Sequence, residues 1–247
     1  DALPISYGAP AVNSYRDMEM GDPRKLRPRP LEAQTEAQGR YLSAMTSSTI
    51  VFGLGPAGTG KTYCAAAWAA EKLLDKKISR IIITRPNIEV GTPMGFLPGE
   101  LEEKYAPYLA PFRAVMIERM GIGAYETGLK NEKICPEPLG YMRGKTFDDA
   151  VVILDEAQNT TAEQMKMFLT RMGVGSKVVV TGDVTQIDLP DGKASGLKEA
   201  MRVLRDVEGI GICELTNADV VRHVMVQRIV EAYERYETAK NGGKGRK

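Results

Sequence analysis

Short, almost continuously apolar runs recur along the middle of the chain, separated by stretches with helical features. Four of them, residues 50–54, 80–84, 150–154 and 177–181, are rich in valine and isoleucine, and a fifth covers residues 210–215. Runs of this length without polar alternation are typical of strands buried on both faces of a parallel sheet. We therefore expect an α/β fold with a mostly parallel sheet of about five core strands and helices on both faces.

The stretches between these runs carry helix signals. Pro107 and Pro111 are expected to interrupt a helix over residues 100–120, while Thr160 and Glu163 form a capping-box pattern that predicts a helix start. Asp219 is expected to cap a last helix. The remaining helical stretches are residues 31–45, 64–74 and 195–207. Residues between about 121 and 139 give no clear pattern.

The octet Gly55-Pro-Ala-Gly-Thr-Gly-Lys-Thr62 lies between the first apolar run and an alanine-rich helical stretch. It fits the phosphate-loop pattern G-x-x-x-x-G-K-[ST] in the strand-loop-helix context that this pattern needs. Glycines let backbone N–H groups of residues 55–62 point at phosphate oxygens, and the helix dipole adds positive potential. Lys61 is expected to reach the terminal phosphates and Thr62 to ligate Mg²⁺. The residues expected to bind nucleotide are Gly55, Pro56, Ala57, Gly58, Thr59, Gly60, Lys61 and Thr62.

The most apolar run, residues 150–154, ends in Asp155 and Glu156, which is a Walker B pattern. Asp155 is expected to hold Mg²⁺, and Glu156 to orient and polarise an attacking water. The second acid favours ATP hydrolysis over phosphoryl transfer to a small molecule, so a small-molecule kinase is disfavoured.

Two further polar sites follow the later apolar runs. Gln186 or Asp183, after residues 177–181, could sense a γ-phosphate, or could lie in a plain surface turn. Arg222 falls in the first turn of the expected last helix, where the helix dipole disfavours a cation. Either it faces a γ-phosphate in its own or a neighbouring subunit, or Asp219 neutralises it. His223, the only histidine, is expected to be structural.

Candidates for contact with nucleic acid are Arg85, Arg143 and Lys145. Arg85 follows an apolar run, and ligands collect at the carboxyl ends of parallel strands. Arg143 and Lys145 flank a glycine, an arrangement that suits phosphate contact or a solvated turn. Residues 1–29 are predicted to be a flexible, basic and proline-rich arm, either solvated or touching nucleic acid or another subunit.

Composition adds mainly exclusions. Lys and Arg number 33 against 32 Asp and Glu, so no global basic bias indicates nucleic acid. Cys64, Cys135 and Cys213 include no C-x-x-C pair, which argues against zinc or disulfides and favours a reducing, cytoplasmic setting. No apolar run approaches the ~20 residues that span a bilayer, and no signal-peptide pattern opens the chain, so no membrane partner is expected.

These motifs together resemble the PhoH-like family of P-loop ATPases, which is related to the ATPase core of superfamily 1 helicases. The resemblance runs from about residue 30 to residue 234, with its motifs in the right order. The matching stretches are residues 55–62, Thr84-Arg-Pro86, Gly95-Phe-Leu-Pro-Gly99, Tyr141-Met-Arg-Gly-Lys-Thr146, Leu154-Asp-Glu-Ala-Gln-Asn159, Leu169-Thr-Arg171, Thr181-Gly-Asp-Val-Thr-Gln186 and Asp219-Val-Val-Arg-His223.

The resemblance implies a RecA-like core in which the Walker B strand is not the immediate neighbour of the phosphate-loop strand. It also implies ATP hydrolysis with Mg²⁺, a homo-oligomeric ring that is often a hexamer, and work on RNA or single-stranded nucleic acid. Gln38, spaced before Tyr41 as in the family, is similar to an adenine-reading glutamine, although a glutamine on a helix is otherwise only solvated. Arg222 is similar to an arginine finger.

We therefore expect one RecA-like domain over residues 30–238, with an insertion at about 87–146 and a flexible tail over 239–247. The catalytic residues would be Lys61, Glu156, Gln186 and Arg222. We expect the chain to carry no second RecA-like domain that could close over ATP, so a neighbouring subunit could supply that face. The expected function is an ATPase with possible RNA helicase activity; the alternative is a nucleotide-gated oligomeric switch without it.

Overall fold

In the computed structural model, the described residues are 30–86, 101–190, 193–221 and eight single positions between 225 and 236, with the backbone alone described for 101–108. Apart from Pro30, they belong to the compact unit that runs from Leu31 to Lys247. The expected last helix, His223, Arg222 and the stretch Gly95–Gly99 lie wholly or largely outside the described residues.

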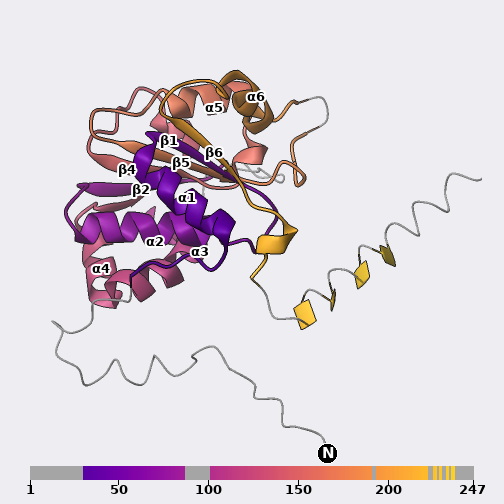
Figure 1. Cartoon of the computed structure of the whole chain (residues 1–247). Coiled ribbons are helices and arrows are strands. Elements are labelled where there is room, and N and C mark those ends of the chain that lie inside the picture. Colours follow the sequence, from indigo (N-terminus) through magenta and orange to yellow (C-terminus); the bar gives the residue numbers. More distant parts are fainter. Residues whose placement is uncertain are drawn as a thin grey trace, which may run out of the picture. The chain divides into compact units, whose positions relative to one another are not determined.

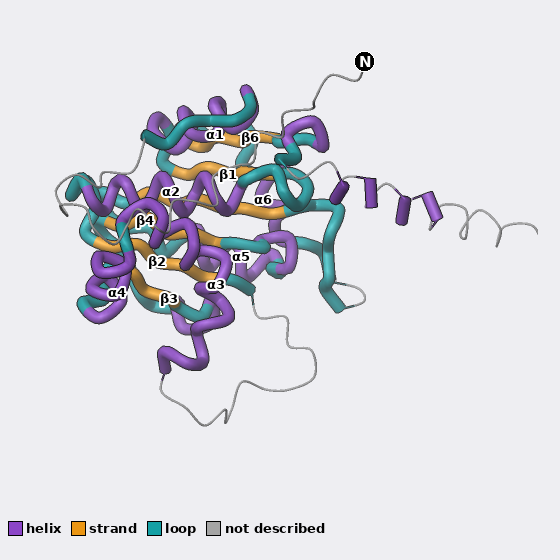
Figure 2. The backbone as a smooth tube through the Cα atoms, turned by 90° about the horizontal axis from the view of Figure 1, so that it is seen from below, coloured by secondary structure: helices purple, strands orange, loops and turns teal. Residues whose placement is uncertain are grey.

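A six-stranded sheet forms the centre of this unit (Figure 1). Its strands are β1 (Ile50–Leu54), β2 (Arg80–Thr84), β3 (Ile134–Pro136), β4 (Ala150–Leu154), β5 (Lys177–Gly182) and β6 (Ile210–Glu214). All neighbouring pairs are parallel, in the order β3-β2-β4-β5-β1-β6 (Figure 2). Because β5 lies between β1 and β4, the phosphate-loop and Walker B strands are separated by one strand, as expected for a RecA-like core.

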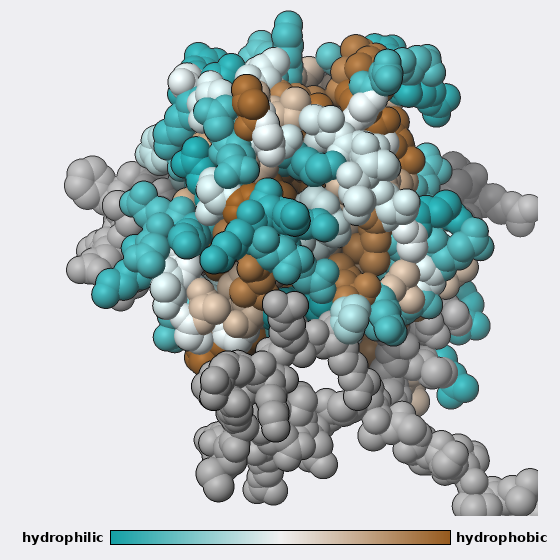
Figure 3. Space-filling view, turned by 60° about the vertical axis from the view of Figure 1, so that its left-hand side comes forward, coloured by the Kyte–Doolittle hydropathy of each residue, from teal (hydrophilic) through white to brown (hydrophobic). Residues whose placement is uncertain are grey.

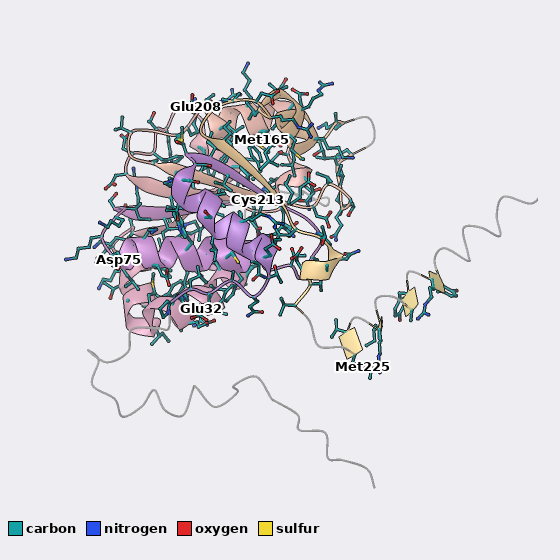
Figure 4. All side chains as sticks on the ribbon, viewed as in Figure 1. Glu32, Asp75, Met165, Glu208, Cys213 and Met225 are labelled. Carbon is teal, nitrogen blue, oxygen red and sulfur yellow. The ribbon has the colours of Figure 1, made fainter. Side chains whose placement is uncertain are left out.

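Successive residues of each strand face opposite sides of the sheet, and both sides are covered. In β4, Val151 and Ile153 belong to one hydrophobic core, whereas Val152 and Leu154 belong to the other. This double burial explains why the strands read as continuous apolar runs. Met165, a member of the core that contains Val152, and Cys213 of β6, which packs against the other core, are labelled in Figure 4.

Among the described residues, six α-helices cover the sheet, and α2 does so with an alanine-rich buried face. The core shared by Tyr41, Trp68 and Met116 joins the helices on one face, and the core containing Phe168 and Leu197 joins those on the other. The helices are α1 (Glu36–Ser47), α2 (Lys61–Leu74), α3 (Leu101–Met120) and α4 (Ile122–Lys130) on the first face, and α5 (Ala162–Leu169) and α6 (Gly196–Val203) on the second. Figure 3 shows hydrophilic side chains over much of one face, with hydrophobic residues between them.

The segment expected to be an insertion contains structure that the sequence did not predict. Helix α3 runs through Pro107 and Pro111 without the expected interruption, and α4 follows it. Strand β3 pairs with β2 from Ile81 to Ile83, which raises the expected five strands to six. Residues 101–136 therefore complete one side of the core, because α3, α4 and β3 all contribute buried side chains to it.

Two capping predictions were wrong by small local shifts. Helix α5 is capped by Thr161 with Gln164, because the hydroxyl of Thr160 instead donates to the carbonyl of Ala157 at 2.7 Å. Asp219 does not begin a helix; its carboxylate accepts from the backbone N–H of Thr216 at 2.8 Å and closes the short 3-10 helix Asn217–Asp219.

Candidate functional site

The phosphate loop connects β1 to α2 and is held from both sides. The Gly55 N–H donates to Gly182 of β5, and a Cβ at Gly55 would lie 2.1 Å from the carbonyl oxygen of Leu215 after β6. Gly55 has a φ of 143° and Gly60 one of 84°, conformations that favour glycine. The loop glycines are therefore required both by backbone conformation and by close packing.

Lys61 points into the loop that precedes it. Its Nζ donates to the carbonyl oxygens of Gly55 at 2.6 Å and Pro56 at 2.7 Å. The ammonium group is thus held over the backbone groups that would surround a phosphate, and its contact with the terminal phosphates stays a prediction.

Asp155 is the most heavily bonded side chain of the site and is only 2% exposed. Its Oδ1 accepts from the hydroxyl of Thr62 at 2.9 Å and from that of Thr181 at 2.5 Å. Its Oδ2 accepts from Nε of Arg85 at 2.9 Å and from Nη2 of Arg85 at 2.5 Å. The two expected metal ligands, Thr62 and Asp155, are therefore in direct contact.

Glu156 follows in a left-handed backbone conformation with a φ of 55°, and its side chain is 50% exposed. Its Oε2 accepts from Nε2 of Gln158 at 2.7 Å, and Oε1 of Gln158 accepts from the Asp183 N–H at 3.1 Å. Gln158, which the sequence analysis did not single out, therefore links the Walker B turn to the loop after β5.

Asp183 and Gln186 lie in that loop. Oδ1 of Asp183 accepts from the N–H and the hydroxyl of Thr185, while Oδ2 is buried and has no partner among the described residues. The Gln186 N–H donates to the carbonyl of Asp183 at 3.1 Å, and its side chain is exposed. The loop is thus a hydrogen-bonded turn that carries both candidate phosphate sensors.

A pocket of about 330 Å³ brings these residues together. Tyr63 also lines it; burial, with a hydrogen bond to Glu118 at 3.0 Å, raises the pKa of Tyr63 to about 12, so its hydroxyl stays protonated at neutral pH. The pocket is lined by Ala57, Gly58, Gly60, Lys61, Thr62, Tyr63, Arg85, Pro111, Asp155, Glu156, Gly182, Asp183 and Gln186.

Gln38 of α1 lies next to the loop but not in the lining of this pocket. It is 5% exposed; its Nε2 donates to the Thr59 carbonyl at 3.0 Å and its Oε1 accepts from the Gln34 N–H at 2.8 Å. A Cβ at Gly60 would lie 2.8 Å from this Nε2. Gln38 supports the phosphate loop in this arrangement, and its role in reading adenine stays a prediction.

The three candidates for nucleic-acid contact are distributed over different places. Arg85 is in the phosphate-loop pocket, and Arg143 is exposed in a turn. Lys145 pairs with Glu137 at 2.5 Å and lines a larger pocket of about 820 Å³ beside β3, which includes no residue of the phosphate loop. The structure therefore brings Arg85 to the phosphate site and leaves Lys145 in a separate one.

The donor set around Asp155 fits Mg²⁺. Mg²⁺ prefers oxygen ligands and usually takes one or two carboxylates together with substrate phosphates. The Thr62 hydroxyl and the Asp155 carboxylate supply such oxygens beside the phosphate loop. Among the described residues, no group of three or more His, Cys, Asp or Glu side chains offers a metal site made by protein alone.

A phosphate loop after β1, two acids after β4 and one intervening strand define the P-loop NTPase fold of RecA-like type. Residues 30–234 match the PhoH-like protein family, and the chain belongs to that family.

Relatives of this family resemble the chain over most of its length. A PhoH-like protein of Mycobacterium tuberculosis (strain ATCC 25618 / H37Rv) is 55% identical over 212 residues, 86% of this chain and 60% of the relative. A PhoH-like protein of Bacillus subtilis (strain 168) is 51% identical over 205 residues, 83% and 64% respectively. Protein PhoH of Escherichia coli (strain K12) is 48% identical over 206 residues, 83% and 58%. The chain thus spans about three fifths of these relatives.

Among solved structures, a Pif1 helicase from Candida albicans aligns with a TM-score of 0.43 and 16% identity, covering 81% of this chain and 43% of that chain. Within the described part of the chain, no helix has the length and apolar character needed to cross a membrane.

Proposed function

We propose that this protein is a Mg²⁺-dependent ATPase. The observation that carries the proposal is the pocket in which Lys61, Thr62, Asp155 and Glu156 meet at the end of the parallel sheet. Ligands of open α/β sheets bind at this edge. A general phosphate-binding loop would not need the second acid after β4, whereas hydrolysis does.

In this proposal, the loop N–H groups and Lys61 hold the β- and γ-phosphates, and Thr62 and Asp155 hold the metal. Mg²⁺ bound there would neutralise charge that develops on the phosphate oxygens. Glu156 orients a water whose oxygen bonds to the γ-phosphorus as the bond to the β,γ-bridging oxygen breaks, giving ADP, phosphate and a released proton. Gln158 keeps the Glu156 carboxylate in place through its 2.7 Å hydrogen bond.

Glu156→Gln tests the hydrolytic part. We expect this variant to bind ATP but to lose about 100-fold or more in kcat, because an amide cannot accept the proton of the water. Glu163→Gln, which changes an exposed acid at the start of α5, is the matched control. Glu156→Gln protein that hydrolyses ATP as fast as wild type would overturn the proposal.

Gln186 and Arg222 complete the proposed catalytic set. Gln186 senses the γ-phosphate, and Arg222 stabilises charge in the transition state. Arg222 acts from a neighbouring subunit of a homo-oligomeric ring, which we expect to be a hexamer. Mixing Arg222→Ala with Lys61→Ala protein should restore part of the activity, since interfaces that join the loop of an Arg222→Ala subunit to the arginine of a Lys61→Ala subunit have both parts intact. No recovery in mixed oligomers verified by native mass measurement would count against an arginine acting in trans.

The polymer that we propose as partner is RNA or single-stranded nucleic acid, with Arg143 and Lys145 as candidate phosphate contacts. Turnover measured with and without single-stranded RNA tests this, and binding should weaken steeply with added salt. RNA-stimulated turnover supports a nucleic-acid motor, for which we propose RNA helicase activity and a cytoplasmic location. ATP turnover that does not change with RNA supports a nucleotide-gated switch instead.

The second candidate is a nucleotide-gated switch without helicase activity. It is favoured by the chain of hydrogen bonds that runs from Glu156 through Gln158 to the Asp183 N–H. A phosphate that contacts the loop carrying Asp183 would act on the water-orienting acid through this chain. Nucleotide-dependent oligomer mass combined with RNA-independent turnover would distinguish the switch from the motor.

A further inference from the structure

Arg85 forms an ion pair with the Walker B aspartate, Asp155. Its guanidinium donates through two nitrogens to the same oxygen, Oδ2 of Asp155, at 2.9 and 2.5 Å, and its Nη2 is also 3.9 Å from Oε1 of Glu156. The Arg85 side chain is 22% exposed, so much of its charge is directed at these two acids.

The hydrogen bonds fill both oxygens of Asp155. Oδ1 receives the hydroxyls of Thr62 and Thr181, and Oδ2 receives Arg85. A buried carboxylate needs a counter-charge, because an unpaired charge is costly away from water. Arg85 supplies this counter-charge, and its guanidinium stays protonated in proteins, so the positive charge is permanent.

A divalent cation bound to the carboxylate oxygens of Asp155 would compensate the same negative charge. Carboxylate oxygens are ligands for Mg²⁺ at about 2.0–2.1 Å, so a metal and a guanidinium on the Asp155 carboxylate would bring like charges together. Since the oxygens already carry their full set of donors, metal ligation requires that a donor leave, and Arg85 is the donor that repels the metal.

We propose that Arg85 is an internal counter-ion that competes with the divalent cation for Asp155 and thereby sets the metal affinity of the site. This inference rests on the proposed function insofar as Asp155 is the metal ligand. When the metal takes Asp155, the guanidinium turns to the other anions that face the same pocket, Glu156 and the phosphates of a bound nucleotide. Arg85 is thus a positioning residue, and metal binding determines which anion it pairs with.

Mn²⁺ binding to the nucleotide-free protein, followed by electron paramagnetic resonance of the free ion, tests the competition without any hydrolysis. We expect Arg85→Gln to bind Mn²⁺ about tenfold to a hundredfold more tightly than wild type, since the competing charge-assisted hydrogen bonds are gone. Arg85→Lys, which keeps a charge but not the two-nitrogen contact, should fall between them. Arg40→Gln, which removes an exposed arginine paired with Glu36, should match wild type.

A melting experiment separates competition from a merely structural role. Without metal, Arg85→Gln should melt below wild type, because Asp155 is left buried and unpaired, and added Mn²⁺ should raise its Tm more than it raises that of wild type. Equal or weaker Mn²⁺ binding by Arg85→Gln would overturn the inference. If Asp155→Asn leaves Mn²⁺ binding unchanged as well, the proposed metal site itself fails; if Asp155→Asn abolishes binding, only the competition fails.

Discussion

The side chain of Gln38 donates a hydrogen bond to the backbone carbonyl of Thr59 at 3.0 Å, which ties α1 to the phosphate loop. We expect Gln38→Ala to weaken nucleotide binding about five- to tenfold, because the loop loses a buried hydrogen bond. If Gln38 also reads adenine, ATP should lose more affinity than GTP.

Titration of fluorescent ATP and GTP analogues measures this difference. Gln34→Ala is the control, since Gln34 is exposed and contributes its backbone N–H to Gln38. Equal loss for both nucleotides would confine Gln38 to supporting the loop.

The hydroxyl of Thr181, which is fully buried, donates to Oδ1 of Asp155. Thr181→Val keeps the branched shape that suits β5 but leaves the carboxylate with one donor fewer. We expect the free energy of unfolding to fall by about 1.5–3 kcal/mol, the usual worth of a hydrogen bond to a charged group. Urea denaturation measures it, with Thr127→Val on the exposed side of α4 as control. Unchanged stability would mean that Thr181 is not needed to hold Asp155.

Helix α6 begins against the turn that starts α5. A Cβ added to Gly196 would lie 2.3 Å from the carbonyl oxygen of Thr161, which is backbone and cannot turn away. We expect Gly196→Ala to lower the free energy of unfolding by about 1–3 kcal/mol, as overpacking does. Gly140→Ala, whose Cβ would meet nothing within 4 Å, is the control. Similar denaturation midpoints for the two variants would contradict this steric account.

Asp219 gives the fold a dependence on acid pH. Hydrogen bonds from the Thr216 N–H and from Thr35 lower the pKa of the Asp219 carboxyl below its ordinary value of 3.8. Since the folded pKa is the lower one, its stabilising contribution is complete above the ordinary value and is lost as the pH falls below about 4.

Asp219→Asn keeps an oxygen acceptor but removes the charge. We expect its Tm to be about 1–3 °C below wild type at pH 7, with the gap closing toward pH 3. Thermal melts across this range measure the gap, and Asp206→Asn, an exposed acid, controls for general charge effects. A gap that stays constant with pH would remove the electrostatic part of this explanation.

The parallel core was predictable from sequence because both of its faces are covered. The expected runs over residues 50–54, 80–84 and 150–154 coincide with β1, β2 and β4. β3 was missed because it has only three residues and ends in Pro136. A segment this short shows neither the length nor the hydrophobic periodicity that predicts a strand. The shifted cap of α5 has a similar cause: Thr160 and Thr161 each precede a suitable partner by three residues, and only tertiary contacts decide between them.

In the candidate site, the sequence identified the residues whose partners are close in the chain, such as Lys61 and the loop glycines. It also placed Arg85 near the ligand end of the sheet, which the structure confirms, but not on Asp155, because that partner lies 70 positions away. Thr181 was missed as a support of Asp155 because the two residues lie 26 positions apart. Gln158 lies only two positions from Glu156, but its second partner, the Asp183 N–H, lies 25 positions away, so its linking role depends on the fold. Contacts between separate strand ends depend on strand order, which no single stretch of sequence encodes.

The Val221 N–H donates to the carbonyl of Gly58 at 3.1 Å, and Arg222 is the next residue in the chain. One backbone hydrogen bond therefore joins the middle of the phosphate loop to the start of the carboxyl-terminal segment. Protection of this single amide against deuterium exchange reports whether the two segments are joined. The Val221 amide thus provides a built-in spectroscopic label for loop rearrangement, readable by NMR without any added probe.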